Sequence, residues 1–236
     1  MGGRPQAAGA DGTVVPSNAL EPLDRPVEEI VDDFTTLYYQ QPAYWADTKW
    51  FGVHCVKSPL DLWVFQEIVH ETRPDLIVET GTWLGGSAYY FASLFDLIGN
   101  GRVISIDLEP PTDEYPMHPR IAYWGGRSSV DPVLLGELRQ EACESKRVMV
   151  VLDSDHRKEH VLEELDAYGP LVSQDCYLVL EDTSINGHPI CAEHGPGPAE
   201  ALMEWLPEHR DEWEVDRRRE KFLTTFNPGG FLRRIR

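Results

Sequence analysis

From about residue 58 onward, short apolar runs alternate with segments of helical periodicity. The apolar runs predict strands at 75–79, 102–107, 121–124, 147–153 and 176–181. Amphipathic stretches between and after them predict helices at about 84–98, 129–143, 156–168 and 197–206. Two more short strands are expected at 213–216 and at 231–235, the second after the turn residues of "FNPGG". Strands that are apolar throughout are typical of a parallel sheet buried on both faces. We therefore predict an α/β fold with a doubly wound, mostly parallel seven-stranded sheet.

A helix start at Ser58 divides the chain into regions. The stretch "SPLD" offers Ser58 as N-cap, Pro59 at the first helical position and Asp61 at the third. Residues 1–25 are rich in Gly, Ala and Pro, which predicts a flexible tail. Residues 26–57 are aromatic-rich and begin with helical spacing, which predicts a small N-terminal helical arm. We expect most of its aromatic rings to pack on the main domain, residues 58–236, or on another subunit.

The composition narrows the range of partners. The 236 residues include 40 acidic and 21 basic side chains, a net charge of −19, which disfavours nucleic acid and an anionic membrane as partners. The four cysteines are scattered without a C-x-x-C pair, which argues against a disulfide framework or structural zinc and favours a cytoplasmic location. The N-terminal stretch lacks the apolar core of a secretory signal, and no apolar run approaches the length of a membrane span.

The turn after the first strand of the sheet predicts a ligand site. In "ETGTWLGG" the glycines Gly81 and Gly85 are spaced more widely than in the G-x-G-x-x-G turn that binds dinucleotides. Glu79 lies close to this turn, where a carboxylate suits an ammonium group better than a pyrophosphate. Asp107 ends the next strand, the place where an acid accepts the hydroxyls of a bound ribose. A nucleoside that carries an amino acid and no phosphate fits both acids.

Further acids end the fourth and fifth strands. Asp153 and Asp155 follow the fourth strand, and Glu181 and Asp182 end the fifth. Because the carboxyl ends of parallel strands meet at one edge of the sheet, these acids should share a site. Oxygen ligands suit Mg²⁺ better than zinc. We predict Asp155, Glu181 and Asp182 as the metal ligands, with Asp153 either a rival ligand or a neighbour of the cofactor's amino group.

The E-x-G-x-x-x-G loop and Asp107 are similar to those of S-adenosylmethionine-dependent methyltransferases. The stretches "YWADTKWFGVHCVKSPLDLW", "IVETGTWLGGSA", "VLDSDHRKEHV" and "LVLEDT" resemble the cephalosporin hydroxylase family of cephamycin antibiotic biosynthesis, over roughly residues 30–236. The resemblance implies a class I methyltransferase fold, S-adenosylmethionine and Mg²⁺ as cofactors, and a homo-oligomer. It further implies O-methylation of a small cephem-type substrate, a 7α-hydroxycephem, to the 7α-methoxy product, with a partner protein supplying the hydroxylation.

The resemblance also implies roles for single residues. "DHRK" at 155–158 resembles the D-H-x-K of catechol-type O-methyltransferases, which implies Asp155 as metal ligand and Lys158 as general base, with His156 as a further catalytic candidate. Catechol-type enzymes carry Asp-Asn where this chain has Glu181-Asp182, and the extra charge should bind a divalent ion more tightly. The cofactor-binding candidates are Glu79, Gly81, Thr82, Gly85, Ser87, Asp107, Ser128 and Asp153.

Besides a methyltransferase, two other functions remain open and a third, a protease, is disfavoured. An iron- and 2-oxoglutarate-dependent hydroxylase, which the family name suggests, needs two His and one carboxylate, but no His follows the only H-x-D, His209-Arg210-Asp211. "HRKEH" at 156–160 fits an inverted zinc-protease motif, although the first turn of a solvated helix explains it better. The other open function is an accessory subunit that binds the cofactor with little catalysis of its own.

Overall fold

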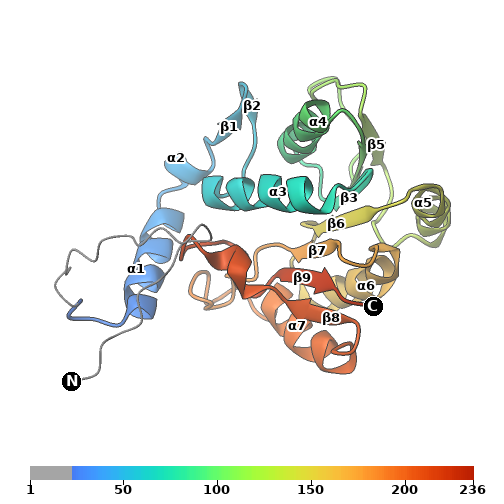
Figure 1. Ribbon diagram of the computed structural model, residues 1–236. Helices are drawn as coiled ribbons and strands as arrows, with labels where there is room; N and C mark the ends of the chain where they lie inside the picture. The colour runs from blue at the N-terminus through green and yellow to red at the C-terminus, as the bar shows by residue number, and fades with distance from the viewer. Residues whose placement is uncertain (1–22) are drawn as a thin grey trace, which may run out of the picture.

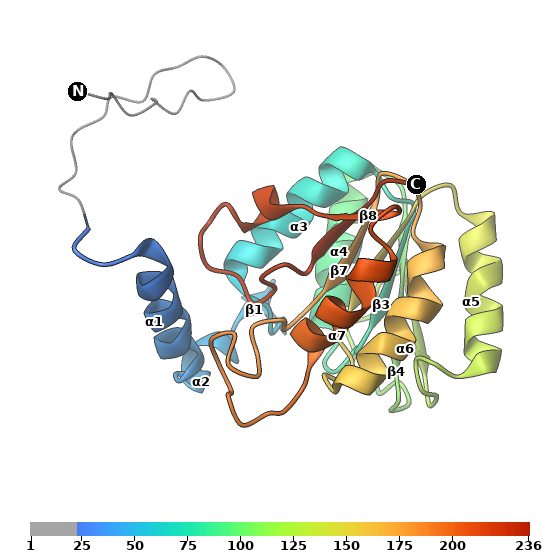
Figure 2. The ribbon, with the colours of Figure 1, turned by 90° about the horizontal axis from the view of Figure 1, so that it is seen from below.

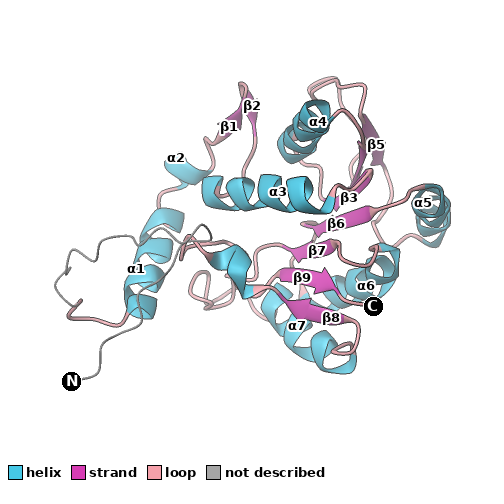
Figure 3. Ribbon diagram, in the orientation of Figure 1, coloured by secondary structure: helices cyan, strands magenta, loops and turns pink. Residues whose placement is uncertain are grey.

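The computed structural model describes residues 23–236, so most of the tail predicted for residues 1–25 lies outside the described part. A seven-stranded sheet in the order β5-β4-β3-β6-β7-β9-β8 forms its centre (Figures 1 and 3). Neighbouring strands are parallel except at β9, which is antiparallel to both β7 and β8. The strands are β3 (Leu76–Thr80), β4 (Arg102–Asp107), β5 (Ile121–Gly125), β6 (Val148–Leu152), β7 (Tyr177–Leu180), β8 (Trp213–Val215) and β9 (Phe231–Arg234). The predicted sheet and its late hairpin are confirmed.

Helices cover both faces of the sheet, which explains why the central strands are apolar throughout. All residues of β3 and β6 are buried. Leu76 and Val78 face the core under α5 (Pro132–Glu144), α6 (Lys158–Tyr168) and α7 (Pro198–Trp205). Ile77, between them in sequence, faces the opposite core under α3 (Pro59–Thr72) and α4 (Gly86–Ile98). Figures 1 and 2 show these two helical layers on either side of the sheet. Within residues 23–236, no helix combines the length and apolar character that crossing a bilayer requires.

The helix starts bear directly on the site. The Ser58 hydroxyl accepts the N–H of Asp61 at 3.4 Å, which confirms the predicted N-cap of α3. Helix α6 begins at Lys158, two residues later than predicted, because residues 153–157 form a loop after β6. His156 therefore lies in a loop and His160 in a helix, so the two do not share the helix face that an inverted zinc-protease motif needs.

The N-terminal arm is helical, as predicted, and also contains a small hairpin that the sequence analysis missed. It consists of α1 (Val27–Tyr39), α2 (Pro42–Trp45) and the antiparallel pair β1 (Lys49–Trp50) and β2 (Val53–His54). Trp50 packs edge-on against Tyr90 of α4, with ring centroids 4.9 Å apart. Tyr38 and Tyr39 lie against Phe226 in the loop before β9. These aromatic residues therefore attach the arm to the sheet domain.

Asp61 links α3 to the loop that precedes β9. Its buried carboxylate accepts the N–H of Phe226 at 2.9 Å, and the neighbouring Asn227 accepts the N–H of Asp182 at 3.0 Å. The loop is thus fixed to α3 on one side and to the end of β7 on the other. Burial raises the pKa of Asp61 to about 6.

Asp61→Asn should change how stability depends on pH. Because the folded pKa lies above the ordinary value, the native state binds more protons than the unfolded state between about pH 4 and pH 6. Wild-type stability should therefore fall as pH rises through this window, and the cost of the ionised carboxylate should be complete above it. Asparagine is neutral and still accepts the N–H of Phe226. The free energy of unfolding of Asp61→Asn should therefore exceed that of the wild type by near zero at about pH 4 and by on the order of 2–3 kcal/mol above pH 6.

The measurement is urea unfolding of both proteins at several pH values. A stability difference that stays constant from pH 4 to pH 7 would show that Asp61 does not titrate in this window.

Candidate functional site

A cavity of about 650 Å³ opens at the carboxyl ends of β3, β4, β6 and β7. This volume is ordinary for a small-molecule site, on the order of 300–1,000 Å³. Strands β4 and β5 extend the sheet on one side of β3, and β6 and β7 extend it on the other, so the cavity lies where the strand order reverses. Eight of the predicted site residues line it: Gly81, Asp107, Ser128, Asp153, Asp155, His156, Glu181 and Asp182.

Two glycines allow chain segments to meet at the cavity. Gly81 has φ +85°, and a Cβ there would lie 1.9 Å from the carbonyl oxygen of Asp153. Only glycine therefore lets the turn after β3 pass the end of β6 so closely. At Gly86, a Cβ would lie 1.8 Å from the carbonyl oxygen of His54. This second contact brings the loop after β2 against the start of α4.

Asp107 holds the turn after β3 in place. Its Oδ2 accepts the backbone N–H groups of Thr82 and Trp83, each at 2.9 Å, and its Oδ1 accepts the N–H of Glu109 at 3.0 Å. The carboxylate lies at the end of β4 and lines the cavity, which is the position predicted for a residue that binds ribose.

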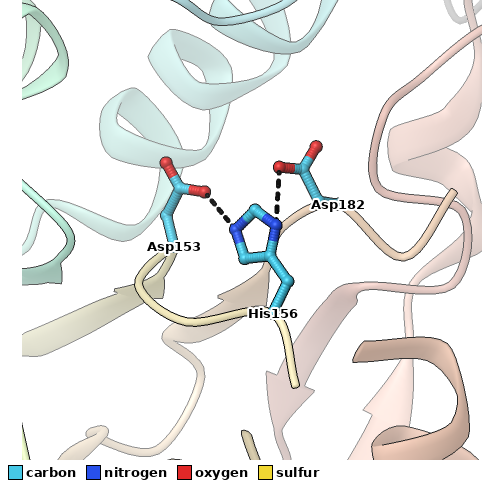
Figure 4. A group of neighbouring side chains, drawn as sticks. All are labelled: Asp153, His156 and Asp182. Atoms are coloured by element: carbon cyan, nitrogen blue, oxygen red, sulfur yellow. Dashed lines mark ion pairs between the residues drawn. The ribbon is translucent and has the colours of Figure 1, made fainter. Parts of the chain in front are cut away.

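Asp153, His156 and Asp182 form a compact charged group (Figure 4). His156 Nε2 lies 3.4 Å from Asp153 Oδ1, and its Nδ1 lies 3.5 Å from Asp182 Oδ2. One potential ligand atom from each residue lies within 4.8 Å of the other two, the spacing of a metal site. Burial lowers the pKa of His156, but the two carboxylates outweigh this effect and raise it to about 9. The imidazole therefore carries a positive charge between two acids.

A buried lysine that the sequence analysis missed lies behind this group. The Lys57 ammonium is paired with Asp153 Oδ2 and lies 2.8 Å from Glu181 Oε2. Burial lowers the pKa of Lys57, but Asp153, Glu181 and Glu79 together raise it well above its ordinary value. Lys57 directly precedes the N-cap of α3, and a lysine at such a position in the sequence is typical of an exposed loop. No local signal in the sequence marks it as part of the site.

Among residues 23–236, two buried carboxylate oxygens have no hydrogen-bond partner, Glu181 Oε1 and Glu79 Oε1. A buried oxygen without a donor is costly unless a cation compensates for it. Glu181 lines the cavity beside Asp182, so a cation bound there would help to compensate its carboxylate. The two aspartates of the group offer oxygen donors, and Glu181 next to Asp182 offers a third carboxylate; such donors fit Mg²⁺.

Asp155 lies apart from the predicted metal ligands. Its carboxylate is bound by the Arg157 guanidinium, with Nε 2.9 Å from Oδ2, which lowers the pKa of Asp155 to about 2. The group with the spacing of a metal site contains Asp153, the rival ligand, instead of Asp155. The difference arises because Asp153 directly follows β6, whereas Asp155 is two residues further along the loop.

Five predicted residues do not line the cavity. Lys158 points to α7, where its Nζ lies 2.5 Å from Glu204 Oε2. Glu79 is fully buried beneath the turn, and its Oε2 accepts the Ser105 hydroxyl at 2.7 Å. The full set is Glu79, Thr82, Gly85, Ser87 and Lys158.

Several residues that line the cavity were not predicted. Phe226 comes from "FNPGG", which the sequence analysis interpreted only as a turn. The apolar and aromatic ones lie close to the motifs in sequence, but nothing in the sequence distinguishes them from core residues. The lining residues that were not predicted include Val56, Trp83, Tyr115, Ser129, His160 and Phe226.

The sheet order, the glycine turn and the acids at the strand ends define a class I methyltransferase fold. A solved structure of CmcI with Mg and SAM aligns with a TM-score of 0.63 over 82% of this chain and 78% of that chain, at 21% sequence identity. Both cofactors that the sequence predicts, S-adenosylmethionine and Mg²⁺, are thus bound in a protein of this fold.

Residues 42–235 match the model of the Rhamnosyl O-methyltransferase/CmcI family. The chain is 36% identical over 227 residues to a rhamnosyl O-methyltransferase of Mycobacterium bovis BCG, covering 93% of this chain and 91% of that protein. A rhamnosyl O-methyltransferase of Mycobacterium leprae is 36% identical over 212 residues, covering 88% and 92%. The chain belongs to this family. Membership confirms the predicted O-methyltransferase activity but does not identify the acceptor.

Proposed function

We propose that the protein transfers the methyl group of S-adenosylmethionine to a hydroxyl of a rhamnosyl acceptor, with Mg²⁺ as the metal ion. The observation that carries the proposal is the position of the Asp153–His156–Asp182 group. It faces a cavity at the switch point of a methyltransferase sheet and lies beside the unpaired oxygen of Glu181.

The half of the cavity between β3 and β4 would hold the cofactor. Asp107 would accept ribose hydroxyls, and Ser128 would border the adenine, since both line the cavity on this side. The turn at Gly81 would lie against the methionine part. When bound, S-adenosylmethionine supplies an electrophilic methyl group.

The half of the cavity between β6 and β7 would hold the metal. Asp153 and Asp182 would be ligands, with Glu181 beside them. Once bound, Mg²⁺ would orient the acceptor hydroxyl, stabilise its alkoxide and neutralise the two carboxylates that favour the imidazolium of His156. His156 would then accept the proton of the acceptor hydroxyl. We place the general base at His156 and not at Lys158, because Lys158 pairs with Glu204 away from the cavity.

The acceptor is inferred from the relatives. The proteins that are 36% identical over nearly the whole chain are named rhamnosyl O-methyltransferases, which favours a sugar hydroxyl. A 7α-hydroxycephem is the second candidate, because CmcI shares the family model and the sequence motifs resemble the cephamycin-pathway family.

The remaining expectations are part of this proposal. Residues 58–236 would form the catalytic domain, although Lys57 enters it from the arm. A cytoplasmic location agrees with the four cysteines, all of which are unpaired. A homo-oligomer agrees with the apolar side chains that α1 exposes, Phe34 and Leu37. A separate hydroxylating partner is needed only for the cephem acceptor.

Asp153→Asn should weaken Mg²⁺ binding at least about tenfold, because it removes one of the charges of the metal site. Asp155→Asn is the matched control, since the Asp155 carboxylate is engaged by Arg157. Titration calorimetry with Mg²⁺ separates the two. Loss of binding in Asp155→Asn alone would return the ligand role to Asp155.

His156→Ala should lower kcat by on the order of 10²–10⁴-fold, the usual contribution of a general base. Lys158→Met should leave kcat within about threefold, since Lys158 does not line the cavity. Both are measured with saturating cofactor and Mg²⁺. A larger loss in Lys158→Met than in His156→Ala would restore the base role of Lys158.

The purified protein should methylate a rhamnoside in the presence of S-adenosylmethionine and Mg²⁺ and should lose this activity when EDTA removes the metal. A 7α-hydroxycephem serves as the competing acceptor, and transfer of labelled methyl is the readout. Transfer to the cephem alone would overturn the sugar assignment. Hydroxylation of the parent cephem with Fe²⁺, 2-oxoglutarate and oxygen, without methyl transfer, would overturn the methyltransferase itself.

A further inference from the structure

We infer that Lys57 determines the metal specificity of the site and favours Mg²⁺ over Ca²⁺. The inference rests on the metal site of the proposed function and concerns a residue that does not line the cavity. Lys57 therefore acts through the carboxylates that it holds, as a positioning residue.

Lys57 engages one oxygen of each of two acids. Its ammonium is paired with Oδ2 of Asp153 and with Oε2 of Glu181, the latter at 2.8 Å. The remaining oxygens point elsewhere: Asp153 Oδ1 faces His156 at 3.4 Å, and Glu181 Oε1 has no partner. Each carboxylate can therefore offer a single oxygen to a metal while Lys57 is in place.

Single-oxygen donors suit one ion better than the other. Mg²⁺ is small, takes an octahedral shell and keeps several waters, so one oxygen from each carboxylate is sufficient. Ca²⁺ takes about six to eight oxygens and commonly uses both oxygens of a carboxylate. Because Lys57 occupies Asp153 Oδ2 and Glu181 Oε2, neither acid can coordinate Ca²⁺ through both of its carboxylate oxygens. The same ammonium lowers the net negative charge of the site, which weakens the attraction for any divalent cation.

The surroundings of Lys57 keep its ammonium at these acids. Its side chain is 4% exposed, so it cannot turn into solvent without leaving the buried carboxylate of Glu181 uncompensated. Its backbone N–H donates to the carbonyl oxygen of Cys55 at 2.8 Å, and the next residue, Ser58, caps α3. The contact between Gly86 and His54 fixes the same loop from the other side.

The test compares Mg²⁺ and Ca²⁺ binding to the full-length protein by titration calorimetry. Lys57→Met should strengthen the binding of both ions, because it removes a competing cation. It should raise the ratio of Ca²⁺ affinity to Mg²⁺ affinity at least about tenfold, because both oxygens of each acid become free. Lys221→Met is the matched control: this lysine pairs with Glu67 at the surface, and its loss should leave the ratio unchanged.

A double variant distinguishes this role from a general loss of packing. In Lys57→Met/Glu181→Gln the new amide offers a single oxygen while Asp153 still offers two, so the ratio should fall part of the way back to the wild-type value. If Lys57→Met does not fold, Lys57→Ala also removes the donor from both acids and should show the same direction of change. An unchanged ratio in a folded Lys57 variant, with Mg²⁺ still bound, overturns the role of Lys57 alone. Failure of the wild type to bind Mg²⁺ overturns the proposed metal site and this inference together.

Discussion

The cavity depends on compensating buried and half-buried negative charge at one edge of the sheet. Asp153, Glu181 and Asp182 come from adjacent strand ends, and positive charge reaches them from Lys57 and His156. A buried charge that loses its partner typically destabilises a protein by about 3–5 kcal/mol. The acids therefore restrict the positions of the segments that contact them: the arm that carries Lys57, the loop after β6 and the loop before β9.

Tight backbone contacts satisfy this constraint. Gly81 lets the turn after β3 touch the carbonyl of Asp153, and Gly86 lets the loop that carries Lys57 reach the start of α4. On the far side, Asn227 accepts the N–H of Asp182. The acids are thus positioned by contacts between backbone segments that are distant in sequence, which leaves their carboxylates available for chemistry.

The strands could be predicted because each is a local pattern: β3 is an apolar run, and the lack of polar alternation in it indicates burial on both faces. Residues at or just after a strand end could be placed at the cavity from the sequence, as Asp107 at the end of β4 and Asp182 two residues after β7 show. The choice between Asp153 and Asp155 depends on where β6 ends and on the binding of Asp155 by Arg157, and the second is a side-chain contact that no spacing encodes. Lys57 was missed because its role arises from contacts with Asp153, 96 positions further along the chain.

Because β9 lies between β7 and β8, β8 can join the sheet only when β9 is in place. During synthesis β8 leaves the ribosome first, yet its only neighbour in the sheet is β9, which lies between β8 and β7. The edge of the nascent sheet therefore stays open at β7 until β9 arrives. Asn227 lies just before that strand, so the backbone of Asp182 acquires its partner at the same moment. The segment that covers the sheet edge at β7 thus also satisfies the backbone of Asp182, which makes the geometry of the acid cluster dependent on a correctly placed β9.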